Sequence, residues 1–243
     1  MVGQGDYPGS SASGPWRHAR SPGESAPVQA LAACEAKAMA SVSRTPRFGS
    51  ASDIPPTTLT AGDLLLRPFT EADEAAVADA LTDAGILSWA AGLAVNAAEP
   101  ADRARLWLVP RLAGWTSGVA PFAVADAADG TLLGYVGVRD IHRAPDQGVA
   151  AYWTTPAARG RHVAARSLDA AATWAFSPAA EGGLGLHRIS LDHALANPAS
   201  CRVAARAGFR EEGVMRGSFV APDGSRHDSH LHARLAPDPH PVL

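Results

Sequence analysis

The sequence predicts a mixed α/β domain, in which helices and strands build one layered fold. Runs rich in β-branched and aromatic residues, such as residues 132–141, alternate along the chain with stretches of helical periodicity, such as residues 163–176. Turn sequences such as Ala-Asp-Gly-Thr at residues 128–131 separate the strand-like runs. No run of about 18 apolar residues predicts a membrane-spanning helix.

The chain is expected to divide into a tail and a domain. Residues 1–57 are dominated by Gly, Ser, Pro and Ala, which offer little apolar surface to offset the entropy of ordering. We therefore expect a disordered, low-complexity tail, in which Met39 is a candidate translation start. Residues 62–236 have the composition of a globular domain.

The first half of the domain predicts one strand, two helices and three further strands. Residues 64–69 (LLLRPF) form a short apolar strand, and the pattern Thr70-x-x-Asp73 after it caps a helix. Residues 101–115 predict a second helix that is interrupted or ends near Pro110. Three β-rich runs follow at residues 120–126, 132–141 and 149–155.

The second half begins with the helix at residues 163–176, which should bury one alanine-rich face. That face consists of Ala164, Leu168, Ala171, Ala172 and Ala175.

The remaining elements are predicted from alternation and from turn residues. Residues 187–195 alternate as a strand with Ile189, Leu191 and Leu195 on one side. A helix then ends at Gly208, a typical residue after a helix C-terminus. Two strands, residues 209–220 and 226–235, end the domain.

Charge and cysteine content exclude several classes of protein. The formal net charge of −3 means that any anion-binding site must be local. Cys34 and Cys201 give neither a disulfide framework nor a metal-ligand spacing. The N-terminus lacks the basic region and apolar core of a secretory signal, so the cytoplasm is the expected location.

Residues 157–166 (AARGRHVAAR) predict a local anion site. A strand, a short loop and a helix N-terminus form the usual phosphate cradle, in which Gly160 lets the backbone approach a ligand. The simpler alternative is that Arg159, Arg161 and Arg166 only solvate an exposed helix end. The dinucleotide fingerprint and the P-loop motif are both absent, which disfavours a Rossmann enzyme and a P-loop NTPase.

Three ordered stretches, YWTTPAARGRHVAARSL, HRISLDHALANPASCRVAARAGF and EEGVMR, carry a family resemblance. Over about residues 62–236 the chain resembles the GNAT superfamily of N-acetyltransferases, and within it the branch similar to ribosomal-protein N-terminal acetyltransferases. The resemblance implies a GNAT-type fold: a central, mostly antiparallel mixed sheet with flanking helices. Two splayed parallel strands, which end in YWTT and RISLDHAL, would admit the pantetheine arm of acetyl-CoA.

The resemblance also implies the residues that bind the co-substrate. In the family signature Arg/Gln-x-x-Gly-x-Gly/Ala, Arg159 is first and Ala164 is last, while His162 replaces the middle glycine. We expect His162 to keep helical dihedrals just inside the helix; its ring would either donate to phosphate or crowd the ligand. The expected acetyl-CoA contacts are Trp153, Thr154, Arg159, Gly160, Arg161, His162, Val163, Ala164, Asn197 and Ser200.

The activity implied is transfer of an acetyl group from acetyl-CoA to a primary amine, either a protein N-terminus or a small molecule. Val149 and Ala204 occupy the positions where many relatives have a glutamate and a tyrosine, and neither can exchange a proton. Direct attack within a ternary complex is therefore expected. Asn197 and Ser200 are the candidate catalytic residues, and Ser200 would hydrogen-bond the departing sulfur.

Other ionisable residues are interpreted more cautiously. Asp140, His142 and His193 are candidate bases, although such residues are more often structural. His230 and His232 share the polar face of the last strand with Arg234, and no further ligand at a plausible spacing appears, so no metal is expected.

The expected partners are acetyl-CoA and an amine acceptor, without nucleic acid or membrane, in a monomer or homodimer. Acceptor choice should depend on residues 84–103, including Trp89, and on the last hairpin. One alternative remains a non-catalytic module that binds or senses acyl-CoA. The other, a nucleic-acid binder, lacks interleaved aromatic residues and a broad basic face.

Overall fold

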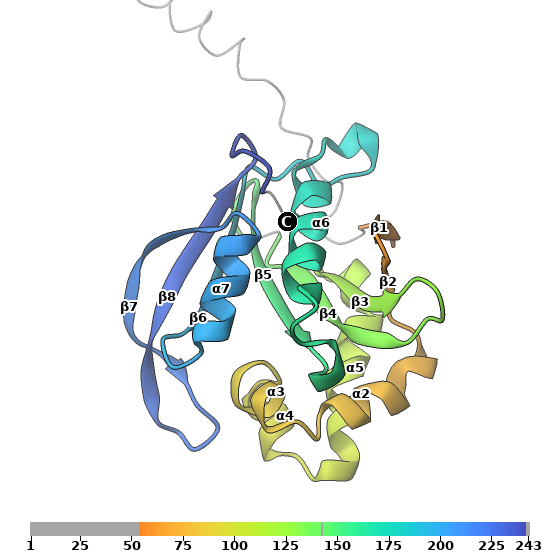
Figure 1. Cartoon of the computed structure of the whole chain (residues 1–243), viewed down its shortest axis with the longest axis vertical. Helices are drawn as coiled ribbons and strands as arrows, with labels where there is room; N and C mark the ends of the chain where they lie inside the picture. The colour runs from red at the N-terminus through yellow and green to blue at the C-terminus, as the bar shows by residue number, and fades with distance from the viewer. Residues whose placement is uncertain (1–53, 142, 242–243) are drawn as a thin grey trace, which may run out of the picture. The chain divides into compact units, whose positions relative to one another are not determined.

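The computed structural model describes residues 54–141 and 143–241 (Figure 1). The expected tail, including Met39, therefore lies outside the described residues as far as residue 53. The last part of that range is described and packs on the domain. Ile54 is only 2% exposed, and its N–H donates to the Trp115 carbonyl at 2.8 Å. The packed part of the chain thus extends at least to Ile54, earlier than residue 62.

Within the described residues the strands form one eight-stranded mixed sheet, which confirms the predicted fold class. Its order is β1-β2-β3-β4-β5-β6-β8-β7, and neighbours are antiparallel except β5 and β6. The strands are β1 (Leu59–Ala61), β2 (Leu64–Pro68), β3 (Ala120–Asp126), β4 (Leu132–Arg139), β5 (Gln147–Thr154), β6 (Arg188–Ala194), β7 (Arg210–Val220) and β8 (Arg226–Leu235).

The parallel strands β5 and β6 pair only at their beginnings. The paired residues run from Gln147 with Arg188 to Val149 with Ser190. Beyond this point β5 continues along β4 as far as Thr154, while β6 continues along β8. The expected splay of these two strands is therefore confirmed, and it opens a gap in the middle of the sheet.

The helices before β3 differ from the prediction of two. The described chain has α2 (Glu74–Ala80), α3 (Ala84–Trp89), α4 (Leu93–Ala97) and α5 (Arg103–Leu112) in this region. The side chain of Asp83 caps α3 by accepting from the Ile86 N–H at 2.8 Å, and Gly92 with φ of 90° separates α3 from α4. The capping box at Thr70 and Asp73 is present, although a 3-10 turn precedes α2.

Two further helices follow, α6 (Val163–Phe176) and α7 (Pro198–Arg206). The expected bounds of α6 are confirmed, and so is the helix end at Gly208, which has φ of 79°. Helix α5 includes Pro110 and ends two residues later at Leu112, near the expected position. Among the described residues no helix is long and apolar enough to cross a membrane.

The helices cover the two faces of the sheet. The alanine-rich face of α6 is buried as predicted, in one apolar core with Phe122, Val136 and Ile189. A second core places α2 to α5 against the other face, around Trp107 and Tyr135. Figure 1 shows α6 and α7 together on the near side of the strands.

Two expectations about side-chain orientation were wrong. Leu195 does not share the buried side of Ile189 and Leu191; it is 41% exposed, because β6 ends at Ala194. The face of β8 that carries His232 and Arg234 was interpreted as the polar face of a last strand, but these two side chains are buried. His232 and Arg234 are only 2% and 1% exposed.

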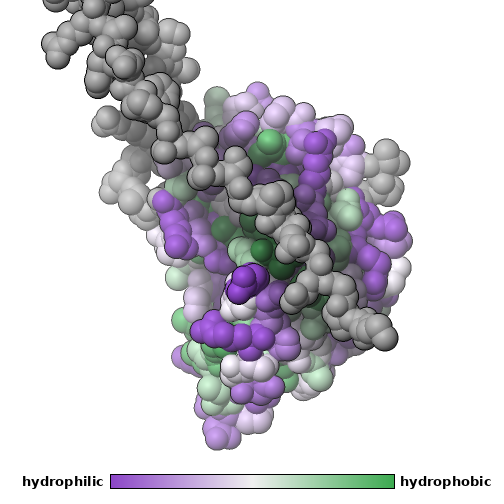
Figure 2. Space-filling model, turned by 90° about the vertical axis from the view of Figure 1, so that its left-hand side faces the viewer, coloured by the Kyte–Doolittle hydropathy of each residue, from purple (hydrophilic) through white to green (hydrophobic). Residues whose placement is uncertain are grey.

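One of the two edges of the sheet is formed by β7, and the other by β1. The exposed positions of β7 carry charged residues such as Arg210, Glu211 and Arg216, and register shifts interrupt its pairing with β8. Figure 2 views this side, where hydrophilic and hydrophobic surfaces are interspersed. Charges and irregular pairing are common ways of preventing a free edge from adding another strand.

Candidate functional site

A cleft of about 920 Å³ lies where β5 and β6 separate. It is lined by α3, β5, the start of α6, β6, α7 and the end of β7. The lining includes every residue expected to contact acetyl-CoA except Arg161, namely Trp153, Thr154, Arg159, Gly160, His162, Val163, Ala164, Asn197 and Ser200. Residues from three separate stretches of sequence thus meet at one place.

The loop before α6 has an unusual backbone. Gly160 and His162 have φ of 79° and 57°, and His162 is the N-cap of α6. The expectation that His162 keeps helical dihedrals was therefore wrong. A glycine adopts this left-handed conformation freely, whereas a side chain there costs about 1 kcal/mol. The conformation gives a physical reason for a glycine at the equivalent position in the family signature.

The backbone amides of this loop and of the first turn of α6 are available to a ligand. Among the described residues, none of the six consecutive N–H groups from Gly160 to Ala165 has a hydrogen-bond acceptor. The first N–H groups of a helix have no partner within the helix, and the helix dipole adds positive potential there. We call residues 159–165 the cradle. It can bind a phosphate group through the backbone.

The three arginines of this region have acidic partners. Arg159 forms a two-point contact with Asp83, at 2.5 and 3.2 Å, and this contact lowers the pKa of Asp83. Arg161 lies 3.5 Å from Asp126, while Arg166 pairs with Asp63. Side chains of the domain therefore supply negative charge near the helix start, which sequence reasoning did not foresee.

Helix α7 adds basic residues that sequence reasoning missed. Arg202 and Arg206 both line the cleft, and Nη1 of Arg206 lies 3.4 Å from Nε2 of His162. The two arginines are four positions apart and so share one face of α7. That spacing was visible in the sequence, but the approach of α7 to the cradle depends on the fold.

At the first turn of α7 a pair of hydroxyl groups, one from the helix and one from β5, lines the cleft. Asn197 caps the helix as expected, because its Oδ1 accepts from the Ser200 N–H at 3.3 Å. The Ser200 hydroxyl lies 2.6 Å from the hydroxyl of Tyr152, which also contacts the Ser200 carbonyl at 3.1 Å. Burial raises the pKa of Tyr152 to about 12, so this phenol keeps its proton at neutral pH.

Tyr152 was not among the expected site residues. It lies three residues beyond Val149, the last residue of β5 that pairs with β6, and its side chain packs in the core shared with α6 and α7. The neighbouring Trp153 points to the other face, 5.4 Å from Trp107. Alternation along the strand would have separated these two residues, but nothing in the sequence shows which of them meets α7.

The remaining candidate bases lie in different surroundings. Asp140 has φ of 58° and pairs with Arg139 at 2.6 Å, while His142 lies outside the described residues. His193 is buried beside His232, with their Nε2 atoms 3.2 Å apart. Ala204 is fully buried in the core, in keeping with the absence of a titratable group at that position.

The opposite end of the cleft has an aromatic wall. Trp89 from α3 and Phe219 from β7 line it, with ring centroids 5.6 Å apart. The two segments expected to select the acceptor therefore meet. Asp192 is the only carboxylate among the described lining residues.

Comparison with known proteins identifies the family of this architecture. A family model described as an acetyltransferase (GNAT) domain matches residues 63–210. No curated protein matches the sequence.

Solved structures show the same fold at low sequence identity. RimJ of Mycobacterium smegmatis, in complex with CoA-disulfide, is 24% identical with a TM-score of 0.62, over 74% of this chain and 88% of that one. A GNAT-family acetyltransferase of Bacillus anthracis is 20% identical with a TM-score of 0.61, over 74% and 99%. RimL, a ribosomal L7/L12 alpha-N-protein acetyltransferase in complex with coenzyme A, is 18% identical with a TM-score of 0.62, over 74% and 98%.

Proposed function

The chain belongs to the GNAT acetyltransferase family, and from this premise we propose that it moves an acetyl group from acetyl-CoA to a primary amine by direct attack in a ternary complex. Membership makes it an acyltransferase with acetyl-CoA as its donor. The observation that carries the proposal is the row of six N–H groups in the cradle, at the mouth of the gap between β5 and β6. This arrangement suits a pyrophosphate with an extended arm attached.

The cradle would hold the pyrophosphate mainly through its backbone. Arg159, Arg202 and Arg206 line the same part of the cleft and can neutralise phosphate charge. The pantetheine arm would then run along the unpaired edge of β5 towards Ser200. Nothing in this arrangement needs the side chain of Arg161, whose guanidinium faces Asp126 and Asp63.

The chemistry requires a neutral amine, a thioester carbonyl and a proton for the departing thiolate. The amine nitrogen forms a bond to the carbonyl carbon, the carbon–sulfur bond breaks, and the sulfur takes up a proton. Ser200, hydrogen-bonded to Tyr152, would donate that proton, and the proton that the amine releases to water would return to the hydroxyl pair, so that both hydroxyls end the cycle protonated. The attacking amine loses its proton to water.

The acceptor would enter from the aromatic wall. Trp89 and Phe219 offer apolar surface, while Asp192 supplies a negative charge in a cleft whose other charged lining residues are basic. A protein N-terminus and a small-molecule amine both satisfy this chemistry. Asp192 would attract either as an ammonium ion before it loses its proton.

The test is thiol release from acetyl-CoA with a panel of amines, N-terminal peptides and aminoglycosides. We expect turnover with at least one primary amine and calorimetric binding of CoA to the unmutated protein. Binding of CoA without turnover of any amine would favour the non-catalytic alternative. An absence of CoA binding would overturn the assignment of the cradle.

A matched pair of variants examines the acceptor end of the cleft. Asp192→Asn should raise KM for the amine roughly tenfold, the effect of removing one charge-assisted contact, with CoA affinity unchanged. Asp129→Asn is the control, because Asp129 lies in the exposed turn between β3 and β4.

A further inference from the structure

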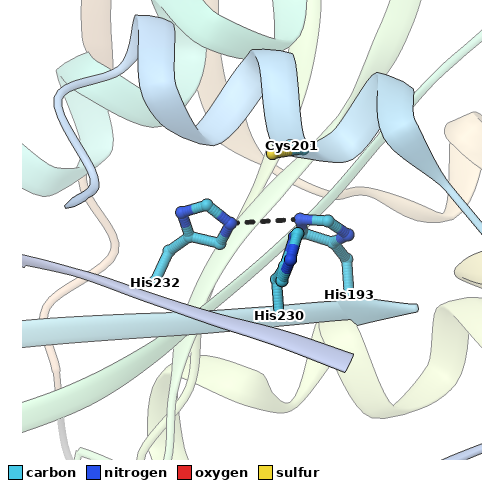
Figure 3. A group of neighbouring side chains, drawn as sticks. All are labelled: His193, Cys201, His230 and His232. Carbon is cyan, nitrogen blue, oxygen red and sulfur yellow. Dashed lines mark hydrogen bonds between the residues drawn. The ribbon is translucent and has the colours of Figure 1, made fainter. Parts of the chain in front are cut away.

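Four side chains with metal-binding atoms gather beside the cleft, and we call them the histidine cluster: His193, which also lines the cleft, Cys201, His230 and His232. Their ligand atoms all lie within 4.8 Å of one another. Figure 3 shows the imidazoles of His193 and His232 pointing toward each other, with Cys201 facing them from the helix above.

The topology of the sheet brings these residues together. His193 on β6 is the direct partner of His230 on β8, and His232 lies two residues further along β8, on the same face. Helix α7 crosses this face and supplies Cys201. From sequence spacing alone, no further metal ligand was expected beside His230 and His232. This expectation was wrong, because the antiparallel pairing of β6 with β8 adds His193 and the crossing of α7 adds Cys201.

The hydrogen bonds of the buried imidazoles leave nitrogen atoms without a protein partner. His193 and His232 are 6% and 2% exposed. Nδ1 of His193 lies 3.0 Å from the Ala194 carbonyl, which can only accept, so the proton of the neutral ring belongs on Nδ1. Its Nε2 then offers a lone pair to Nε2 of His232, 3.2 Å away. Nδ1 of His232 is buried and has no hydrogen-bond partner among the described residues.

This pattern is typical of imidazoles that bind a metal ion. A ligating histidine usually donates its other N–H to a backbone carbonyl or a carboxylate, as His193 does to Ala194. Glu211 plays a similar part for His230, since its carboxylate lies 3.7 Å from Nε2 of that ring.

The distances are close to those of a tetrahedral site. With zinc–nitrogen bonds of about 2.0–2.1 Å, two ligand nitrogens are about 3.3 Å apart, and the two Nε2 atoms lie at 3.2 Å. The widest pair must close from at most 4.8 Å by at most roughly 1.5 Å, which side-chain rotation can provide. Three imidazoles and a thiolate favour Zn²⁺ and Co²⁺ over Mg²⁺ and Ca²⁺, which prefer oxygen ligands.

We propose that His193, Cys201, His230 and His232 form a transition-metal site of the zinc type, which fastens the start of α7 to β6 and β8. A site closed by four protein ligands has a structural role, since no position is left for a substrate. Cys201 directly follows Ser200, so an ion at this site would fix the helical turn that presents Ser200 to the cleft. The proposal does not depend on the acceptor or on catalysis.

The test uses the full-length protein after removal of metal with a chelator, titrated with Co²⁺ alone. We expect one Co²⁺ per chain, with the intense visible bands of tetrahedral cobalt and a thiolate-to-metal charge-transfer band in the near ultraviolet. Zn²⁺ should displace the cobalt and should raise Tm, because binding to the folded state adds to its stability.

Matched variants identify the ligands. Cys201→Ser should abolish the charge-transfer band, and His230→Gln should weaken Co²⁺ binding at least roughly tenfold, since one of four ligands is lost. Cys34→Ser and His187→Gln are the controls: Cys34 is the other cysteine of the sequence, and His187 is exposed outside the cluster. Both controls should keep every band.

The proposal is overturned if the unmutated protein shows no stoichiometric charge-transfer band and no Zn²⁺-dependent rise in Tm. It is also overturned if the band survives Cys201→Ser or disappears in Cys34→Ser. Melting in excess chelator shows whether a variant still folds. If the Cys201→Ser variant does not fold, the charge-transfer bands of the unmutated protein and of the Cys34→Ser variant still test the proposed site.

Discussion

The cradle and the histidine cluster are two concentrations of polar groups near helix α7. The cradle is continuous in sequence, and its arginines are largely exposed; the side chains of Arg159 and Arg161 are 48% and 46% accessible. The cluster comes from β6, α7 and β8, and two of its imidazoles are buried. The cradle exposes its charged side chains to solvent, whereas the histidine cluster encloses imidazoles in the fold.

This difference decides what each region contributes. Exposed ion pairs are screened by water and salt and contribute little to stability, so the arginines of the cradle remain available to a ligand. Buried polar groups must be satisfied internally, because an unpaired one costs about 1–3 kcal/mol. The cradle is therefore expected to act on binding, and the cluster on stability.

The largest expected effect compares the two regions directly. His232→Ala should lower the free energy of unfolding by about 2–4 kcal/mol, because it leaves a cavity and removes the partner of His193. Arg161→Ala should change it by less than about 0.5 kcal/mol. Urea denaturation in excess chelator measures both without a contribution from metal. Equal effects would show that the cluster is not the more stabilising of the two.

The second effect is on ligand binding. Arg159→Ala should weaken CoA binding by about 1–3 kcal/mol, the range for a charge-assisted hydrogen bond. The KM for acetyl-CoA should rise more than kcat falls, because the pyrophosphate is bound alike in the ground and transition states.

Asp83→Asn is the matched control for Arg159→Ala. Asparagine preserves the cap of α3 but removes the carboxylate that Arg159 contacts. CoA should then bind at least as tightly as to the unmutated protein, because Arg159 is released toward the phosphate. Weaker binding in Asp83→Asn would show that the ion pair itself holds the site in shape.

The third effect concerns the hydroxyl pair. Ser200→Ala and Tyr152→Phe should each lower kcat about tenfold, less than the roughly 10²–10⁴ that general acid catalysis typically contributes, because water can also protonate the departing thiolate. Because the two hydroxyls form one hydrogen-bonded unit, the double variant should be little worse than either single one. Additive losses, or a raised KM for acetyl-CoA with kcat unchanged, would contradict the assigned role.

The same contrast explains what could be predicted from the sequence. The cradle was visible because Arg159, Gly160 and Ala164 are neighbours in the chain, and the periodicity of α6 predicted its buried face. The histidine cluster was not visible, since it depends on the register of β6 with β8. Tyr152 was missed for a similar reason: its partner Ser200 is 48 positions away.

Backbone conformation was the other limit. His162 was expected in helical geometry because the helix begins beside it, yet the loop requires a left-handed residue at that position. A sequence pattern shows which residue types are present, but it does not show the φ that the preceding strand and the following helix impose.

The smallest expected effect tests that backbone conformation. His162→Gly should raise the free energy of unfolding by about 0.5–1 kcal/mol, because glycine removes the left-handed strain while the unfolded chain gains some entropy. His162→Asn is the control, since asparagine tolerates this conformation better than most residues and keeps a polar side chain.

The ring of His162 contacts Arg206 at 3.4 Å, and the backbone N–H groups of the cradle do not depend on it. We therefore expect calorimetry to show CoA affinity within about threefold of the unmutated protein. Binding that is tenfold weaker in both variants would mean that the imidazole donates to the phosphate, and binding that is tenfold tighter in His162→Gly alone would mean that the ring crowds the ligand. Either result would add a side-chain contribution to a cradle that otherwise binds through its backbone.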